Sequence, residues 1–358
     1  MMIYRADYLQ CWIVRATRPQ ITPTSAPGAC GVGKTDDMTS TVLVSGASGF
    51  VGSHVARALV EAGHEVRAMT RWPEEYDGPG TAVAADVEDF ASLRRAMECV
   101  DAAYYLVHSL DSEGFEKKDA EAADCFGRAA FEAGVEQIVY LGGLGRDDDE
   151  LSTHLRSRRE VESILGEAGV PVTVLRAAIV VGHGGISWEI TRQLVDLLPG
   201  LVVPDWMETR TQPIALRDVV RYLVGVLENP EARGRVFEIG GPDVLQYAEM
   251  LQRAAEVQGD QLPSVRLPAG LSKLVPPSVS SGWLALLTDV DSNTAANLVG
   301  SLVNEAVVTQ TGIQQVVPGV CLTYEESVLE ALAAREAAAG EAVAGSSSSA
   351  SLSGSGSE

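Results

Sequence analysis

Apolar and polar positions alternate along the chain as short apolar runs followed by longer amphipathic segments. The first apolar run, residues 41–45, ends in glycines, and an amphipathic segment over residues 50–62 follows at once. A second strand is expected over residues 65–70. This order, continued to about residue 176, predicts parallel strands connected by helices. Further strands are expected over residues 82–85, 102–107, 137–141 and 172–176, and further helices over residues 88–97, 114–133 and 152–168.

Three glycines with a spacing of three residues lie between the first strand and the first helix. Gly46, Gly49 and Gly52 allow a tight turn, close approach of the backbone to a pyrophosphate, and close packing of helix on strand. The helix N-terminus adds free N–H groups and a favourable dipole. On the motif alone, a glycine-rich turn without ligand is an equal alternative. The flanking strands and helix favour a dinucleotide site in a doubly wound parallel sheet.

The residues that follow each strand are expected to surround a ligand at the carboxyl edge of such a sheet. Arg71 follows the second strand, where an acidic residue would bind the ribose of NAD; arginine can accept a 2′-phosphate and favours NADP, with NAD as the alternative. An ordinary surface role for Arg71 stays open. Asp86 and Val87 follow the third strand and suit the adenine edge and face, and Val107 and His108 follow the fourth.

Seven segments in a fixed order resemble atypical and extended short-chain dehydrogenase/reductases. They lie between residues 45 and 250 and read SGASGFVG, AADVEDFASLRRAM, DAAYYLVHSL, IVYLGGLG, VTVLRAAIVVG, TQPIALRDVVRYLV and VFEIGGPDVLQYAEM. The resemblance as a whole covers roughly residues 41–330. The likeness is greatest to the NAD(P)-binding proteins grouped with NmrA-like regulators and with the nucleotide-holding accessory subunit of respiratory complex I.

The resemblance implies a Rossmann domain over residues 38–330, with a smaller C-terminal lobe formed by about residues 184–206 and 236–326. The lobe would close over the nicotinamide. The residues that the resemblance assigns to the cofactor are Gly46, Ser48, Gly49, Phe50, Val51, Gly52, Arg71, Asp86, Val87, Val107 and His108.

The chain departs from the family at the catalytic pair. Active short-chain reductases carry Tyr-x-x-x-Lys on the helix after the fifth strand, where the lysine lowers the pKa of the tyrosine. Here His154 and Arg158 stand four residues apart at what look like the Tyr and Lys positions, and Gly142 and Gly143 stand where many members carry a serine. His154 could transfer a proton, its pKa lowered by the like charge, while Arg158 holds the ribose or a phosphate. Alternatively His154 has no chemical role, and Arg158 only clamps the cofactor or forms an ion pair.

Two classes of function remain. One is an NAD(P)H-dependent oxidoreductase acting on a small or hydrophobic carbonyl or quinone-like substrate. The other is a cofactor-binding protein without turnover, either a redox sensor or an accessory subunit of a respiratory or lipid-modifying complex. Peripheral association with a membrane or a complex stays open in both classes.

Several other positions have two interpretations each. Arg176 either flanks the nicotinamide or forms an ion pair at the edge of the core. Asp205, Trp206 and Arg210 either line a substrate cavity or, for the aromatic residue, pack in the lobe core. The apolar stretch over residues 283–287 could dock a lipid-like substrate, a partner or a membrane surface, although a buried lobe helix is the simpler interpretation.

The two ends of the chain are expected to lie outside the fold. Residues 1–37 are irregular, and a start at Met38 would omit them. They contain Gly28 to Thr35, which fits the P-loop pattern, but prolines precede it and no apolar-faced helix follows, so we reject that site. Residues 331–358 are rich in alanine and then in glycine and serine, which predicts a disordered acidic tail.

Cysteines and histidines give no sign of a metal site. The five cysteines are scattered and odd in number, which is typical of reduced thiols inside a cell. The five histidines are equally dispersed. No apolar run is long enough to span a membrane, and no signal peptide is evident, so a cytoplasmic location is expected.

The chain of 358 residues is strongly acidic, with 49 Asp and Glu against 27 Lys and Arg and a net charge of -22. Such a surface repels nucleic acid, so we expect no nucleic-acid partner. Its scarcity of lysine resembles proteins of salt-loving archaea, whose repulsive charges are screened by salt. We therefore expect the unfolding midpoint to rise from dilute buffer to molar KCl. A flat or falling midpoint would remove this halophilic hypothesis.

Overall fold

The computed structural model describes residues 39–109, 114–146, 149–266 and 292–352. Its central element is a seven-stranded parallel sheet in the order β11-β6-β5-β4-β1-β2-β3. This confirms the predicted α/β fold with a doubly wound parallel sheet. The strands are β1 (Thr41–Ser45), β2 (Glu65–Thr70), β3 (Thr81–Ala84), β4 (Ala102–Tyr105), β5 (Gln137–Gly143), β6 (Val172–Ala177) and β11 (Val236–Ile239).

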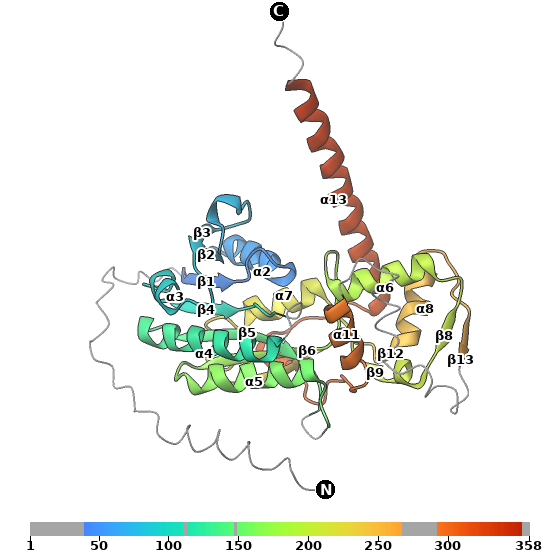
Figure 1. Ribbon diagram of the computed structural model, residues 1–358, viewed down its shortest axis with the longest axis horizontal. Coiled ribbons are helices and arrows are strands. Elements are labelled where there is room, and N and C mark those ends of the chain that lie inside the picture. Colours follow the sequence, from blue (N-terminus) through green and yellow to red (C-terminus); the bar gives the residue numbers. More distant parts are fainter. Residues whose placement is uncertain (1–38, 110–113, 147–148, 267–291, 353–358) are drawn as a thin grey trace, which may run out of the picture. The chain divides into compact units, whose positions relative to one another are not determined.

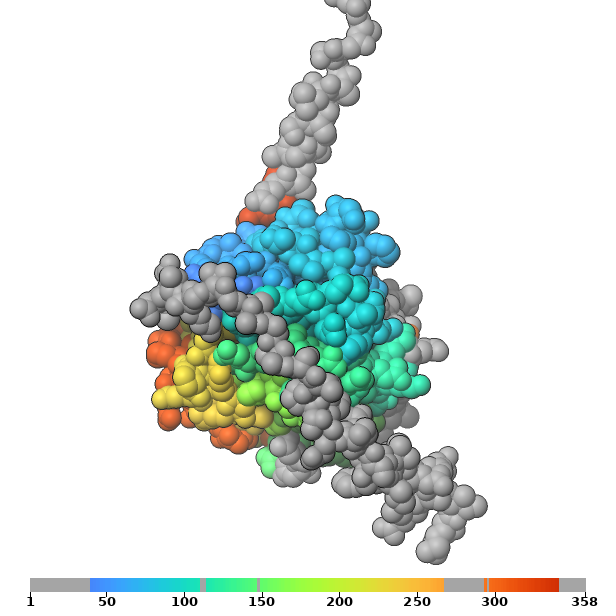
Figure 2. All heavy atoms as spheres, turned by 90° about the vertical axis from the view of Figure 1, so that its left-hand side faces the viewer, coloured from blue at the N-terminus to red at the C-terminus, as the bar shows by residue number. Residues whose placement is uncertain are grey.

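Helices cover both faces of the sheet because successive strand residues point to opposite sides. Val42 and Val44 of β1 pack in one apolar cluster with α2 and α7, whereas Leu43 packs in another with α3, α4 and α5. Figure 1 shows α2 and α7 on one side of the strands, with α4 and α5 on the other. In Figure 2 the cyan residues of α3 and the green residues of α4 lie side by side on the surface. The helices concerned are α2 (Phe50–Glu61), α3 (Phe90–Ala96), α4 (Phe115–Ala133), α5 (Thr153–Glu167) and α7 (Leu216–Gly225).

A second apolar core belongs to the C-terminal lobe. It gathers side chains from residues 181–207, 245–262 and 324–331, together with Val299. The elements of the lobe and its connections are β7 (Val180–Val181), α6 (Ile186–Leu197), β8 (Leu201–Val203), η2 (Asp205–Glu208), β9 (Arg210–Thr211), β10 (Ile214–Ala215), β12 (Leu245–Gln246), α8 (Tyr247–Val257), β13 (Ser264–Arg266), α11 (Ser292–Ser301), α12 (Ile313–Val316) and α13 (Tyr324–Leu352). The short helix η1 (Pro73–Glu75) follows β2.

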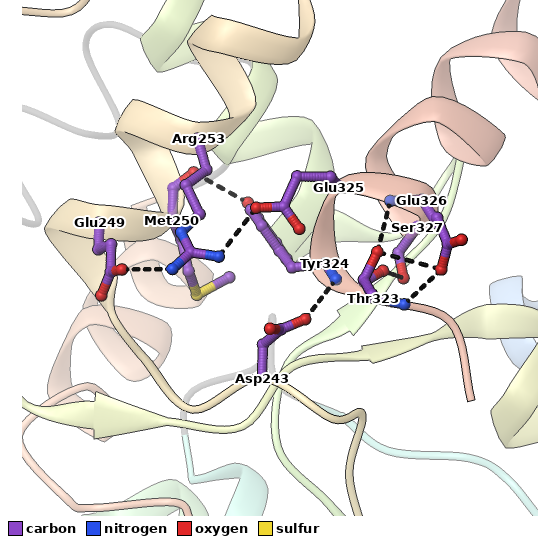
Figure 3. A network of polar contacts seen from close by, with 9 residues as sticks. All are labelled: Asp243, Glu249, Met250, Arg253, Thr323, Tyr324, Glu325, Glu326 and Ser327. Atoms are coloured by element: carbon purple, nitrogen blue, oxygen red, sulfur yellow. Dashed lines mark hydrogen bonds and ion pairs between the residues drawn. The ribbon is translucent and has the colours of Figure 1, made fainter. Parts of the chain in front are cut away.

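The start of α13 is fixed to α8 by a polar network (Figure 3). Thr323 Oγ1 accepts from the Glu326 N–H, and the Glu326 carboxylate accepts from the Thr323 N–H, which is a capping box. The buried hydroxyl of Tyr324 donates to the carbonyl of Met250, and Arg253 of α8 pairs with Glu325. These contacts hold α8 in place, so they also fix Tyr247 at its first position.

The predicted elements of the sheet agree closely with the structure. The strands at residues 41–45 and 65–70 have the predicted bounds, and the other strands and helices differ by a few residues at their ends. The segment over residues 236–239 is different, because we placed it in the lobe. It pairs in parallel with β6 and forms the edge strand of the main sheet.

Other expectations differ from the structure or lie outside it. The chain continues as α13 to Leu352, where a disordered tail was predicted from residue 331. Cys125 and Cys321 are free thiols, whereas Cys99 is disulfide-bonded, so the expectation of five reduced thiols is wrong for Cys99. Residues 1–37, including the rejected P-loop pattern, and residues 283–287 lie outside the described residues. Within the described ranges, no helix combines the length and apolar character that a membrane crossing requires.

Candidate functional site

The glycine turn brings the start of α2 against the end of β1. Gly46 has a positive φ of 69°, and its carbonyl accepts from the Gly49 N–H at 2.9 Å. A Cβ on Gly52 would lie 2.0 Å from the Gly46 carbonyl oxygen, and one on Gly46 would lie 2.8 Å from the Leu106 carbonyl oxygen. Both obstacles are backbone atoms, so these two positions require glycine.

This turn leaves a helix N-terminus with free donors. Gly49 is the N-cap of α2 and provides no side-chain cap. The N–H groups of Phe50, Val51 and Gly52 therefore have no partner within the helix. Because the dipole adds positive potential there, the arrangement fits the pyrophosphate of a dinucleotide.

The residues after β2, β3 and β4 lie at the same edge of the sheet. Arg71 is exposed, and no described carboxylate forms an ion pair with it. Asp86 is half-buried; its N–H donates to Ser92, and its carboxylate accepts from the N–H of Glu88. Val87 is half-buried beside it.

A cavity of about 320 Å³ opens beside the turn, and we call it the turn cavity. Its wall includes seven of the predicted site residues, namely Gly49, Phe50, Val51, Gly52, His108, His154 and Arg158. The other predicted residues lie outside its wall: Gly46, Ser48, Arg71, Asp86, Val87 and Val107. The structure thus brings the turn, the end of β4 and the start of α5 together around one space.

His154 and Arg158 contact each other on α5, as their spacing predicts. Arg158 Nε donates to His154 Nε2 at 3.4 Å, which leaves the ring proton of a neutral imidazole on Nδ1. Burial, and to a smaller extent the charge of Arg158, lower the pKa of His154 to about 3. His154 is therefore neutral near pH 7. The sequence indicated the charge of Arg158 but not the larger effect of burial.

His108 lies in the cavity wall beside this pair. The side chain of His108 is exposed, but the residues around it in the cavity wall keep water away from part of the ring. This desolvation lowers the pKa of His108, and Arg158 and His154 lower it further. Two neutral imidazoles and one guanidinium thus lie together at this part of the cavity.

The position of α5 depends on contacts from other elements. Ser152 caps the helix by accepting from the Leu155 N–H, and its own N–H donates to Asn304 at 2.9 Å. The buried Asp119 of α4 accepts from the Ser109 N–H at 3.0 Å and lies 3.5 Å from the Ser157 hydroxyl. Burial raises the pKa of Asp119, whereas Arg158 and these hydrogen bonds lower it. These contacts connect the loop after β4 to α5.

Arg176 forms the ion pair that was one of its two interpretations. Its guanidinium holds both carboxylate oxygens of Glu162 at 2.7 and 3.0 Å, and it is absent from the cavity wall. Arg210 reaches the turn cavity although it pairs with Glu305 at 2.6 Å. Asp205 lines neither this cavity nor the second cavity, which lies in the lobe.

A second cavity of about 340 Å³ lies in the lobe, and we call it the lobe cavity. Trp206 contributes to its wall, as one interpretation of the sequence proposed. The two cavities share six wall residues, which we call the junction: Ile179, Ser187, Tyr247, Leu298, Ser301 and Leu302.

Sequence reasoning missed most of the junction. Ile179 follows β6 and could have been found by the same strand-end rule that gave His108. Ser187 and Tyr247 are the second residue of α6 and the first of α8, and no local pattern marks either one. Gly182 and Gly185 bring the loop before α6 against Phe50, since a Cβ on Gly185 would lie 2.6 Å from the Phe50 ring.

A protein-family model described as NAD(P)H-binding matches residues 46–230, which include the glycine turn, His108 and α5. The chain belongs to this NAD(P)H-binding family. The match agrees with the predicted NAD(P) site and leaves the choice between NAD and NADP open.

This NAD(P)H-binding protein is similar to reductases and to a respiratory subunit. A (4-alkanoyl-5-oxo-2,5-dihydrofuran-3-yl)methyl phosphate reductase of Streptomyces griseus is 27% identical over 252 residues, which cover 68% of this chain and 84% of the relative. Subunit 9 of the NADH dehydrogenase [ubiquinone] 1 alpha subcomplex of Mus musculus is 24% identical, covering 64% and 69%. The structure of Citrobacter sp. triphenylmethane reductase complexed with NADP(H) has the same fold, with a TM-score of 0.64, 17% identity and coverage of 81% and 99%.

The lowered pKa of His154 predicts a pH dependence of stability. Between pH 7 and pH 5 the unfolded chain protonates this histidine, whose ordinary pKa is about 6.5, but the folded chain does not. Stability present at neutral pH is therefore lost on acidification, and His154 contributes about 2 kcal/mol of that loss. Urea unfolding of the His154→Asn variant should show a smaller loss than the wild type. The neighbouring Thr153→Ala variant serves as the control, and equal losses in all three proteins would contradict the assignment.

Proposed function

We propose that this protein is an NAD(P)H-dependent reductase of a hydrophobic carbonyl compound. The observation that carries the proposal is the junction, where the turn cavity with His154 and Arg158 meets the apolar lobe cavity. A cofactor held at the glycine turn and an apolar substrate held in the lobe would come together there. The Streptomyces relative supports this substrate class, because it is a reductase of a compound that carries an alkanoyl group.

The residues of the turn would hold the dinucleotide. The first N–H groups of α2 would donate to its pyrophosphate, and Arg158 would contribute a permanent positive charge near the nicotinamide ribose. When bound, the reduced nicotinamide supplies a hydride to the carbonyl carbon. The apolar residues of the junction would exclude water from that point.

The lowered pKa of His154 defines what its ring can contribute. At pH 7 a histidine with a pKa of about 3 is charged in roughly one molecule in ten thousand, so its imidazolium is a poor source of protons. The neutral Nδ1–H is buried without a hydrogen-bond partner among the described residues, so it would donate to an oxygen that gains negative charge once a bound substrate reaches it. We therefore propose that His154 polarises the substrate carbonyl and that water supplies the proton.

Turnover should be measured with NADPH against a panel of aliphatic aldehydes, ketones and quinones. We expect NADPH oxidation with apolar carbonyls, and we expect His154→Ala to lower kcat by about 10²-fold or more while NADPH affinity persists. Loss of cofactor affinity in this variant would show a binding role instead. Tight NADPH binding without oxidation across the panel would overturn the reductase assignment.

That last outcome would favour the second candidate, a cofactor-holding protein without turnover. The observation in its favour is the composition of α5, which contains neither tyrosine nor lysine. Similarity to the mouse subunit of NADH dehydrogenase supports the same candidate. Co-purification with a membrane complex would then be the result to look for.

We further propose that NADP is preferred over NAD. Arg71 is exposed at the end of β2 and has no described carboxylate partner, so its guanidinium is available for a 2′-phosphate. The Arg71→Glu variant should lose about tenfold or more of its NADPH affinity, while its NADH affinity stays within a fewfold. Titrations with both cofactors measure this, and Arg57→Glu on the exposed side of α2 makes the same charge change as a control. Unchanged selectivity would refute the role of Arg71.

A further inference from the structure

The lobe cavity is almost entirely apolar. None of its described wall residues carries a charge. The wall away from the junction is formed mainly by aliphatic side chains of α6, β8 and α8, among them Ile190, Leu194, Leu201 and Leu251. Trp206 adds its ring, because the Nε1 atom of the indole is buried and does not face the open space.

Polar side chains of the wall gather at the junction, and most of them are already hydrogen-bonded. The Ser301 hydroxyl donates to the Leu298 carbonyl at 2.6 Å. The Tyr247 hydroxyl bonds the side chain of Thr191. Ser187 differs, since its hydroxyl has no hydrogen bond to another described residue. The junction therefore has one hydroxyl that can bind a polar group of a ligand.

This distribution excludes a sugar or another polyhydroxyl ligand. Each hydroxyl placed beyond the junction would lose its hydrogen bonds to water without finding a partner. An aliphatic chain has no hydrogen bonds to water to lose, and its burial is favoured by the hydrophobic effect. The apolar wall also continues to the surface, because Val202 of the wall is 58% exposed and is paired with Val265, which is 68% exposed.

We propose that the lobe cavity binds a linear aliphatic chain whose polar head lies at the junction, next to Ser187. This inference rests on the proposed function in one respect, because it makes the head group the carbonyl that is reduced. The substrate class is then a long-chain aldehyde or ketone, or an acyl compound with such a carbonyl. The chain supplies binding energy, and the junction places the head beside the turn cavity.

The inference can be tested without cofactor and without turnover. Binding of n-alkanols from butanol to decanol to the full chain should strengthen by about fourfold per added methylene until the cavity is full. Calorimetric titration measures this series. Affinity that does not depend on chain length, or a ring compound such as a short-chain quinone that binds more tightly than every alkanol, would overturn the inference.

Two neighbouring leucines provide a matched pair of variants. Leu198 lines the lobe cavity, whereas Leu197 is 55% exposed and does not. We expect Leu198→Trp to weaken decanol binding at least tenfold, with NADPH binding retained as evidence of folding, and Leu197→Trp to match the wild type. Equal effects of the two substitutions would contradict the proposed location.

A third variant gives an independent readout. Trp206→Ala enlarges the cavity, so the chain length at which affinity stops rising should increase. An unchanged limit would count against Trp206 as part of the chain-binding wall.

The results separate this inference from the proposed function. Chain-length-dependent binding together with no NADPH oxidation would keep the aliphatic site and reject the reductase. Reduction of short aldehydes without any dependence on chain length would keep the reductase and reject the aliphatic site.

Discussion

The contact between the first turn of α2 and the glycine turn is the constraint on which the site depends. Gly52 faces the Gly46 carbonyl so closely that a Cβ would lie 2.0 Å from the oxygen. Since the obstacle is backbone, no change of rotamer could relieve it. This approach sets the position of Phe50, against which the loop before α6 packs through Gly182 and Gly185. The lobe is therefore joined to the nucleotide-binding sheet at the place where the dinucleotide would lie.

The electrostatic character of this part of the turn cavity is set by His154 and Arg158, which by our sequence prediction stand where active reductases carry tyrosine and lysine. In a Tyr–Lys pair the cation stabilises the anion that the tyrosine becomes, so the charge promotes proton release. Here the cation lies beside a ring that would itself become positive, and burial acts in the same direction. The site therefore has one permanent positive charge, on Arg158, and two neutral imidazoles. Such a site can orient and polarise an oxygen, but it does not supply a proton at neutral pH.

The sequence predicted the sheet better than the site, for a physical reason. Residues 41–45 end at a glycine and residues 65–70 lie between a glycine turn and the polar residues that follow Thr70, so the bounds of both strands are set locally. We did not assign residues 236–239 to the sheet, because an edge strand buries only part of its length and only two of its four residues are buried. His154 and Arg158 could be paired from helical spacing alone. The burial of His154 could not, because it depends on packing from elements far along the chain.

The junction, too, could not be predicted from local sequence patterns. Ser187 and Tyr247 are 60 residues apart in the sequence, and they line the same two cavities because α6 and α8 share the lobe core. Their roles are set by the lobe's packing and not by any local motif. Strand-end reasoning applies to the sheet, where topology fixes which residues converge. It has no counterpart in a lobe built from separate segments.

Asn304 has a consequence for how the site assembles. Its side chain accepts from the Ser152 N–H and donates to the Glu150 carbonyl, at a sequence separation of about 150 residues. It also lines the turn cavity. A nascent chain that has emerged only as far as residue 230 contains every residue of the family match but lacks this support for the start of α5. The residues of the family match, including the glycine turn, are therefore synthesised early. Asn304, which completes the wall of the turn cavity, is synthesised late.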